Sequence, residues 1–120
     1  MTAPIESEIF AAFDQWTTEW NNGNITGYLE AYLDAPYTRY VSGKTILIGR
    51  ENIVSHFQNR GAVGTLFLAK KEIDFVSETN AQMFGEYVVK LDDGTEAKGC
   101  FTVYLQKIEE GWKIVYDHSS

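Results

Sequence analysis

The chain has 120 residues, of which 44% are hydrophobic, and this size and composition predict a single globular domain over residues 1–120. The net charge of −7, without a run of Lys or Arg, excludes nucleic acids and anionic membranes as expected partners. One cysteine excludes an internal disulfide, and the absence of a leader pattern or of an apolar run near ~20 residues predicts a soluble, cytoplasmic protein.

Two helices are predicted in the N-terminal third. Residues 4–22 carry apolar side chains at helical spacing, with Thr2 as a candidate N-cap and Pro4 in the first turn, and an Asn-Gly pair stops this helix. Asn24 is a candidate cap for a second, short helix. That helix is expected to end at Pro36, because the residue before a proline avoids helical backbone angles. Its apolar positions are Tyr28, Leu29, Tyr32 and Leu33.

A strand pair and a third helix are predicted next. Residues 37–41 form a β-type run, residues 42–44 a turn and residues 45–48 a second short strand. Residues 50–60 return to helical spacing, and Gly61 and Gly64 close this helix.

The second half of the chain predicts an antiparallel meander with short turns. Its strands are expected over residues 65–76, 81–91, 96–108 and 112–118. Helices grouped before a meander indicate the α+β class, with N-terminal helices packed on the apolar concave face of a strongly curved, mostly antiparallel sheet. Aromatic residues make up 14% of the chain, so the interior is either a pocket walled by rings or a core of large side chains.

Two segments resemble a known superfamily. The segment EWNNGNITGYLEAYLDAPYTRYVSGKTILIGRENIVSHF resembles the N-terminal half of SnoaL-like domains, and KGCFTVYLQKIEEGWKIVYDHSS resembles their C-terminal half. SnoaL-like and ketosteroid-isomerase-like domains belong to the nuclear transport factor 2-like superfamily, and the calcium/calmodulin-dependent kinase association domain is similar in both segments. The resemblance implies a cone-like fold whose open end leads to a pocket between helices and sheet, and a homodimer formed through the outer sheet face.

The last strand carries the first candidate catalytic residues. Strand alternation places Asp117 and Ser119 on one face, and Tyr116 and His118 on the other. A carboxyl in an apolar cone has a raised pKa and can act as a general acid or base. The alternatives are that Asp117 bonds backbone or water near the chain end, and that His118 is a satisfied core or interface histidine.

Glu86 is the second candidate carboxylate, because it lies in an otherwise apolar strand and shares a face with Phe84 and Val88. Matched to the kinase association domain, Glu86 and Thr102 fall on two positions where that family has pocket arginines. The change of charge implies that the family's preference for anions does not transfer. The alternative is that Glu86 points outward.

Two further sets of residues are candidates for ligand binding. Arg39 offers a fork for a carboxylate if its face lines the cone; if that face points outward, Thr38 and Tyr40 line the interior instead. Among the helical aromatic residues, Trp16 and Phe57 are the best pocket candidates, although such stripes also build cores.

Metal and cofactor sites are not expected. His56 and His118 are far apart in sequence, and no Cys or carboxylate lies near either at metal-ligand spacing. Glycine-rich phosphate loops and nucleophile elbows are absent as well, so no cofactor is predicted.

Steroid-type isomerisation is not expected either. That reaction needs a carboxylate base with a Tyr and a protonated Asp as oxyanion donors. Matched to the ketosteroid isomerase family, this chain has Trp16 at the Tyr position, Val41 at the base position, and Thr102 or Cys100 near the Asp position. SnoaL-like cyclases use a carboxylate in the cone, and only Asp117 or Glu86 can fill that role here.

Three hypotheses for function remain. The first is acid/base isomerisation, cyclisation or dehydration of a small, largely apolar carbonyl compound. Asp117 or Glu86 would be its base, and an oxygen would be polarised by one of Arg39, Thr102 or His118. The second is a non-catalytic domain that binds a small acid or a lipid-like metabolite. The third is an oligomerisation module, by analogy with the kinase association domain.

Overall fold

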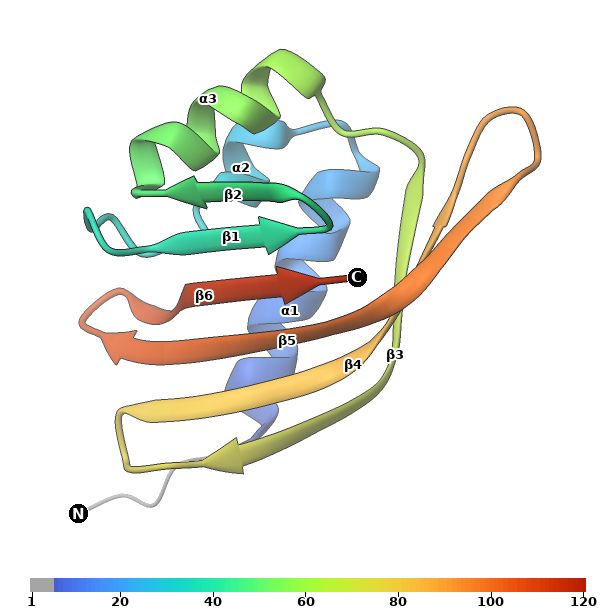
Figure 1. Ribbon diagram of the computed structural model, residues 1–120. Coiled ribbons are helices and arrows are strands. Elements are labelled where there is room, and N and C mark those ends of the chain that lie inside the picture. The colour runs from blue at the N-terminus through green and yellow to red at the C-terminus, as the bar shows by residue number, and fades with distance from the viewer. Residues whose placement is uncertain (1–5) are drawn as a thin grey trace.

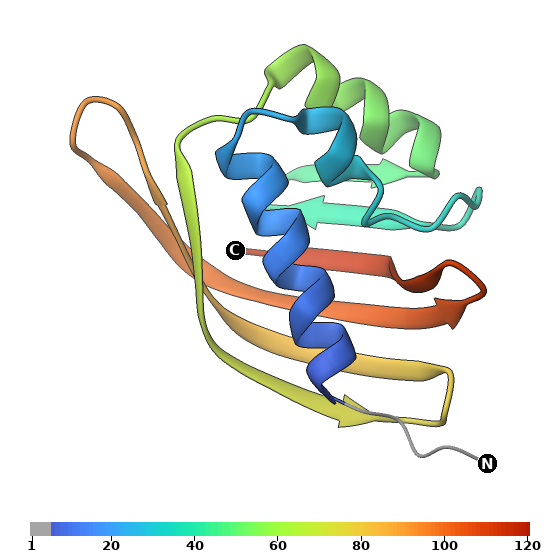
Figure 2. The same cartoon turned by 180° about the vertical axis from the view of Figure 1, so that it is seen from behind.

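Residues 6–120, which the computed structural model describes, fold into helices that lie across one face of a six-stranded sheet (Figure 1). The strand order is β2-β1-β6-β5-β4-β3. Seen from behind, α1 (Glu6–Asn21) runs across the concave side of the curved sheet (Figure 2). The predicted N-cap Thr2 and first-turn Pro4 lie outside the described residues. The α+β class expected from the sequence is confirmed.

The first helix, α1, faces the sheet with one apolar side. Its buried residues recur at a spacing of three and four, which places them on a single face of the helix. They are Ile9, Phe13, Trp16 and Trp20. The helix ends where Gly23 takes a positive φ of 77°, a conformation that glycine adopts without steric cost.

The second helix, α2 (Ile25–Leu29), is shorter than the sequence predicts, because the chain leaves the helix well before Pro36. The backbone that follows pairs with the last strand: the Leu33 N–H donates to the Ile114 carbonyl at 2.9 Å, and the Ile114 N–H donates to the Ala31 carbonyl at 2.7 Å. These tertiary hydrogen bonds override the helical periodicity. They hold Tyr32 beside β6 (Gly111–Ser119).

The last strand, β6, joins the two parts of the sheet. It runs parallel to β1 (Arg39–Ser42), which pairs antiparallel with β2 (Thr45–Ile48) and starts two residues later than predicted. On its other side lie the antiparallel strands β5 (Glu96–Ile108), β4 (Asn80–Lys90) and β3 (Thr65–Phe75). The remaining helix, α3 (Arg50–Arg60), follows β2 and packs against it and β1. The sheet is therefore mostly antiparallel, as predicted.

One β-bulge lies in β3. Lys70 and Lys71 together oppose the single residue Gly85 of β4, and Lys70 adopts a positive φ of 53°. Because of this bulge the two lysines diverge: Lys70 pairs with Glu86 on the outside, whereas Lys71 reaches Asp14 of α1. The strand β3 bends around the helix layer (Figure 2).

A second β-bulge lies in β6, where Val115 is an extra residue between two that pair with adjacent positions of β5. Side chains of a strand alternate between faces, so one extra residue reverses which later residues point inward. Before the bulge, Trp112 and Ile114 are buried under the helices; after it, Asp117 and Ser119 take the inner face.

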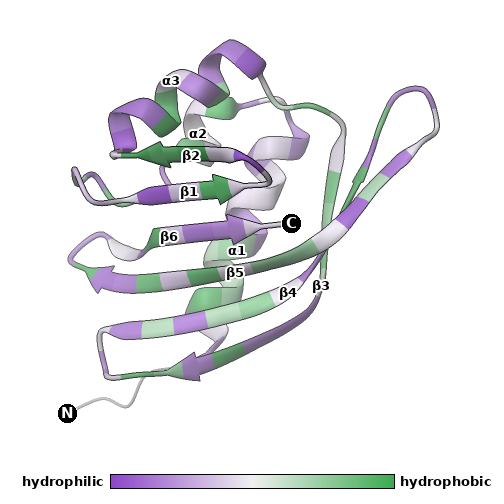
Figure 3. Cartoon of the chain, viewed as in Figure 1, coloured by the Kyte–Doolittle hydropathy of each residue, from purple (hydrophilic) through white to green (hydrophobic). Residues whose placement is uncertain are grey.

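The colours of Figure 3 alternate along much of the strands, as expected for a sheet with one covered face. The buried inner residues of the sheet include Tyr40, Met83, Val103 and Ile114, which pack against α1 and α3. Within residues 6–120, none of the helices has the length and apolar character needed to cross a membrane.

Candidate functional site

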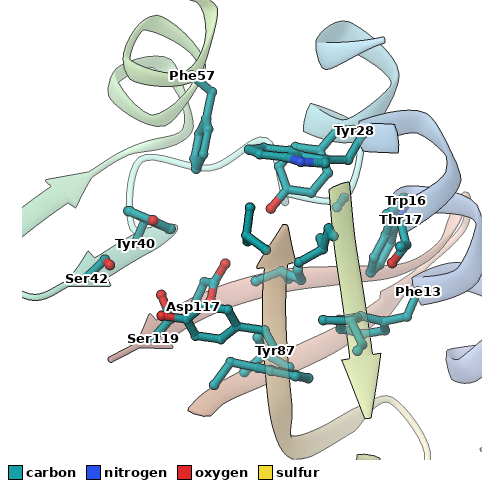
Figure 4. Close-up of a pocket in the computed structure, with 18 of the residues that line it drawn as sticks. Phe13, Trp16, Thr17, Tyr28, Tyr40, Ser42, Phe57, Tyr87, Asp117 and Ser119 are labelled. Atoms are coloured by element: carbon teal, nitrogen blue, oxygen red, sulfur yellow. The ribbon is translucent and has the colours of Figure 1, made fainter. Parts of the chain in front are cut away.

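A cavity of about 230 Å³ lies between the helix layer and the concave face of the sheet. Its walls come from α1, α2, α3 and five of the strands, and they are mostly aromatic or aliphatic. Figure 4 shows Phe57 and Tyr28 on the helix side, with Asp117, Ser119 and Tyr87 on the sheet side. Asp117 and Arg60 are the two charged residues of the lining, so polar recognition is concentrated at few positions.

Asp117 is positioned by β6. Its neighbours on the inner face are Tyr40 of β1 and Val103 of β5, and the bulge at Val115 is what turns it toward the cavity. The Tyr32 hydroxyl donates a hydrogen bond to Asp117 Oδ2 at 2.6 Å. Burial against these apolar walls raises the pKa of Asp117 to about 6, and this outweighs the lowering effects of the Tyr32 hydrogen bond and of nearby His118.

The hydroxyls of two tyrosines continue the series of polar contacts that begins at Asp117. The hydroxyls of Tyr32 and Tyr28 are 3.4 Å apart, and Tyr28 lines the cavity, whereas Tyr32 lies behind its wall. Burial, followed by the negative charge of Asp117, raises the pKa of both phenols above the ordinary value. Both tyrosines are therefore neutral and able to donate at physiological pH.

Phe57 is the centre of the aromatic wall. Its ring centroid lies 5.2 Å from that of Tyr40, 5.7 Å from that of Tyr28 and 6.0 Å from that of Trp20, in edge-to-face arrangements. The Trp20 Nε1 atom is buried without a hydrogen-bond partner in residues 6–120. This cluster fixes the ring of Tyr28 and thereby the direction of its hydroxyl.

Four of the eight residues expected at the site line the cavity. Trp16 comes from α1, Tyr40 from β1, Phe57 from α3 and Asp117 from β6. Tyr40 lines the interior as in the second of the two alternatives that the sequence left open for β1.

The other four expected residues lie on the opposite face of the sheet, which corrects their predicted placement. The inner row Tyr40, Asp117 and Val103 obliges their strand neighbours to point outward. Arg39 lies over the Tyr116 ring, 5.5 Å from its centroid, on that outer face. Thr102 and His118 are exposed there and pair with each other in register.

Glu86 is the fourth of these. Its side chain is 46% exposed, and its Oε1 lies 3.3 Å from Lys70 Nζ. An exposed ion pair of this kind contributes little to stability and offers no desolvated carboxylate. Asp117 is therefore the carboxylate that faces the cavity.

Sequence reasoning missed Tyr28, Tyr32 and Arg60. The two tyrosines were considered only as apolar and aromatic positions of helices, and no role was predicted for their hydroxyls. Their four-residue spacing was a usable signal, because a buried phenol requires a hydrogen-bond partner that phenylalanine does not. That partner is 85 residues away from Tyr32 in sequence, and the sequence does not reveal it. Among residues 6–120, no group of three or more His, Cys, Asp or Glu side chains could hold a metal ion.

Solved structures show the same fold. A nuclear transport factor 2-like protein of unknown function from Shewanella oneidensis is 24% identical, with a TM-score of 0.88 over 96% of this chain and 98% of that chain. A protein from Xanthomonas campestris whose name suggests a calcium/calmodulin dependent protein kinase II association domain is 18% identical, with a TM-score of 0.77 over 100% of this chain and 91% of that chain.

A third similar structure, from Novosphingobium aromaticivorans, has a name that suggests an aromatic ring hydroxylase. It is 17% identical, with a TM-score of 0.79 over 99% of this chain and 91% of that chain. A search of curated proteins found no significant match. The family model of the SnoaL-like domain matches residues 9–120, nearly the whole sequence. The chain belongs to the SnoaL-like domain family, with a nuclear transport factor 2-like fold.

Proposed function

We propose that the cavity binds a small, largely apolar carbonyl compound and that Asp117 acts on it as a general acid or base, in an isomerisation, a cyclisation or a dehydration. The observation that carries this proposal is a carboxyl group that lines an apolar cavity and has a pKa of about 6. A base with a pKa near the working pH is ionised often enough to accept a proton and is basic enough to hold it.

The three reactions share one step, the removal of a proton from the carbon next to the carbonyl. Asp117 is suited to this step because its carboxylate is desolvated by aromatic and aliphatic neighbours, which leave room for an apolar substrate body. Proton abstraction can therefore be tested without knowing the natural substrate.

The test is hydrogen–deuterium exchange at the activated carbon of 2-tetralone in D₂O, followed by proton NMR. The protein is expected to accelerate exchange above the buffer rate. Asp117→Asn is expected to slow the protein-dependent rate by about 100-fold or more, since general base catalysis contributes at least that much. Glu86→Gln is the matched control, because it also removes one carboxylate but on the outer face. Equal rates for the protein and Asp117→Asn would contradict the proposal.

The second candidate function is binding without catalysis, which the predominantly apolar lining supports. In that case 2-tetralone or a similar compound binds, as seen by chemical-shift changes of cavity residues, yet its exchange rate equals the buffer rate. Catalysed exchange that depends on Asp117 decides against this candidate.

The outer face of the sheet supports a proposed homodimer. Ile46, Ile48, Phe84 and Tyr116 are between 47% and 65% exposed and come from β2, β4 and β6. Exposed apolar residues gathered on one face are typical of protein interfaces. Sedimentation should give the mass of two chains, and Ile46→Lys combined with Phe84→Lys should give the mass of one. A wild-type protein that sediments as a single chain at high concentration would rule out the dimer.

A further inference from the structure

The proposed chemistry needs a donor for the substrate's oxygen, and the residues that the sequence offered for it, Arg39, Thr102 and His118, lie on the outer face. We propose that the Tyr28 hydroxyl is this donor and that Tyr32 couples it to Asp117. This inference rests on the proposed function and narrows its substrate class to carbonyl compounds that can enolise. Their oxygen would lie at Tyr28 and their acidic carbon at Asp117.

The arrangement of the three side chains carries the inference. Tyr28 and Asp117 both line the cavity, so one small ligand can touch both. Tyr32 lies behind them and contacts each: its hydroxyl donates to Asp117 at 2.6 Å and lies 3.4 Å from that of Tyr28. The cavity thus has two chemically different ends that are connected through the wall.

Tyr32 is held firmly enough to serve as a connection. It is 2% exposed, and the pairing of its backbone with β6 ties it to the strand that carries Asp117. From the other side, Arg50 Nε donates to the Tyr32 carbonyl at 3.2 Å. The Tyr32 backbone is therefore fixed, and its side chain extends from a fixed position toward both Asp117 and Tyr28.

The number of hydroxyl protons links the two ends of the hydrogen-bonded series formed by Tyr28, Tyr32 and Asp117. Each phenol has one proton to donate. When Asp117 is ionised, Tyr32 donates to it, and the Tyr32 oxygen is then free to accept the proton of Tyr28. When Asp117 has gained a proton, it can donate to Tyr32, Tyr32 can turn its proton to Tyr28, and the proton of Tyr28 is released for a ligand. Protonation of Asp117 thereby creates a donor at the other end of the cavity.

The proposed proton abstraction protonates Asp117 and so produces this reversal of the hydrogen-bond directions. Asp117 removes the proton next to the carbonyl, the C–H electron pair forms the C=C bond, and the π pair of the carbonyl moves onto its oxygen. The negative charge thus leaves Asp117 and appears at the oxygen, where Tyr28 now donates. Return of the proton to the same carbon gives exchange, and return to a conjugated carbon gives isomerisation.

The charges around Tyr28 also favour a negative substrate oxygen at this end of the cavity once Asp117 is protonated. Asp117 and Tyr40 disfavour negative charge at the Tyr28 hydroxyl, whereas Arg60 of α3 favours it. Once Asp117 is neutral, its opposing effect is removed and that of Arg60 remains. An oxyanion at this end is therefore stabilised after proton transfer and not before it.

The test uses 4-nitrophenol, whose phenolate imitates an enolate and whose visible absorption reports binding near neutral pH. Asp117→Asn, which imitates the protonated carboxyl, is expected to bind the phenolate about tenfold more tightly than the unmodified protein. Adding Tyr28→Phe should remove this gain, as loss of one oxyanion donor costs about 10-fold or more. Adding Tyr32→Phe should remove a large part of it, while Tyr37→Phe, an exposed tyrosine, should leave it unchanged.

Two results would overturn the inference: unchanged phenolate affinity on adding Tyr28→Phe to Asp117→Asn, or unchanged affinity on adding Tyr32→Phe. Thermal unfolding of each variant checks that the fold is retained, as expected because each Tyr→Phe change keeps the ring and Asp117→Asn keeps the shape of the side chain. The exchange assay separates the two proposals. If the binding pattern holds but 2-tetralone exchange is not catalysed, the proposed function fails alone. If exchange depends on Asp117 but not on Tyr28, the inference fails alone.

Discussion

The two faces of the sheet are built from the same strands, yet they treat a carboxylate in opposite ways. Glu86 on the outer face is solvated and paired with Lys70, and its neighbours Phe84 and Cys100 on that face are exposed. Asp117 on the inner face is surrounded by aromatic rings, is held by a buried phenol and has a pKa near 6. The difference teaches that desolvation, more than residue type, makes a carboxylate useful for proton transfer.

Removal of a central ring is the strongest test of the difference between the faces. Phe57→Ala is expected to lower the free energy of unfolding by about 3–5 kcal/mol, because Phe57 is buried and contacts several other rings. Phe84→Ala on the outer face is its matched control, with an expected loss of about 1 kcal/mol or less. Urea denaturation measures both, and equal losses would remove the distinction between a packed and an open face.

Replacement of Asp117 tests the difference in electrostatics. The folded pKa of Asp117 is raised from 3.8 to about 6, so the folded protein binds the extra proton more strongly and loses stability as pH rises through this window. The loss amounts to about 3 kcal/mol above pH 6, and Asp117→Asn abolishes it. The variant should therefore gain stability relative to the unmodified protein between about pH 4 and pH 6.5.

Urea denaturation across this pH range measures the effect, with Glu86→Gln as the control that removes one carboxylate from the outer face. A constant difference between Asp117→Asn and the unmodified protein at all pH values would mean that Asp117 titrates like an exposed carboxyl.

Loss of the Tyr32 hydroxyl should increase the difference between the pKa of Asp117 and that of an ordinary carboxyl. The hydrogen bond from Tyr32 lowers the pKa of Asp117, so Tyr32→Phe is expected to raise that pKa above about 6. It should also reduce stability at neutral pH by about 2 kcal/mol, the usual contribution of a hydrogen bond to a charged group. Carbon-13 NMR of the Asp117 carboxyl measures the first effect. An unchanged or lower pKa would show that the contact is not made in solution.

The smallest effect is expected on the outer face. Lys70→Ala removes the ion pair with Glu86, and exposed pairs contribute roughly 0–1 kcal/mol. The shift in thermal unfolding should shrink further in high salt, since the pair is screened. A loss comparable to that of Phe57→Ala would mean that Lys70 supports the bulge of β3 by more than its charge.

The sequence was sufficient for most of the fold because α1, α3 and the long strands each have strong periodicity and clear turn signals. It failed at α2, where pairing of Leu33 and Ala31 with Ile114 of β6 replaced a longer helix. Helical spacing at Tyr28, Leu29 and Tyr32 could not reveal that competition, because the competing hydrogen bonds come from the other end of the chain.

The site was harder to predict because it depends on a single extra residue. Counting alternate positions from the buried Trp112 and Ile114 puts Asp117 outside, and only the bulge at Val115 brings it inside. The sequence showed that Asp117 and Ser119 share a face, but not that this face is the inner one. Pairing of β6 with β1 and β5 decides that question.

The position of β6 also bears on how the molecule is made. The β1-β2 hairpin has no strand partner in the meander of β3, β4 and β5, and residues 111–119 are the bridge between them. About nine-tenths of these residues have therefore been synthesised before β6 can join the β1-β2 hairpin to the meander. Until β6 is synthesised, the edges of β1 and β5 that pair with it lack a partner strand. We therefore expect chaperones that bind unpaired strands to bind the nascent chain.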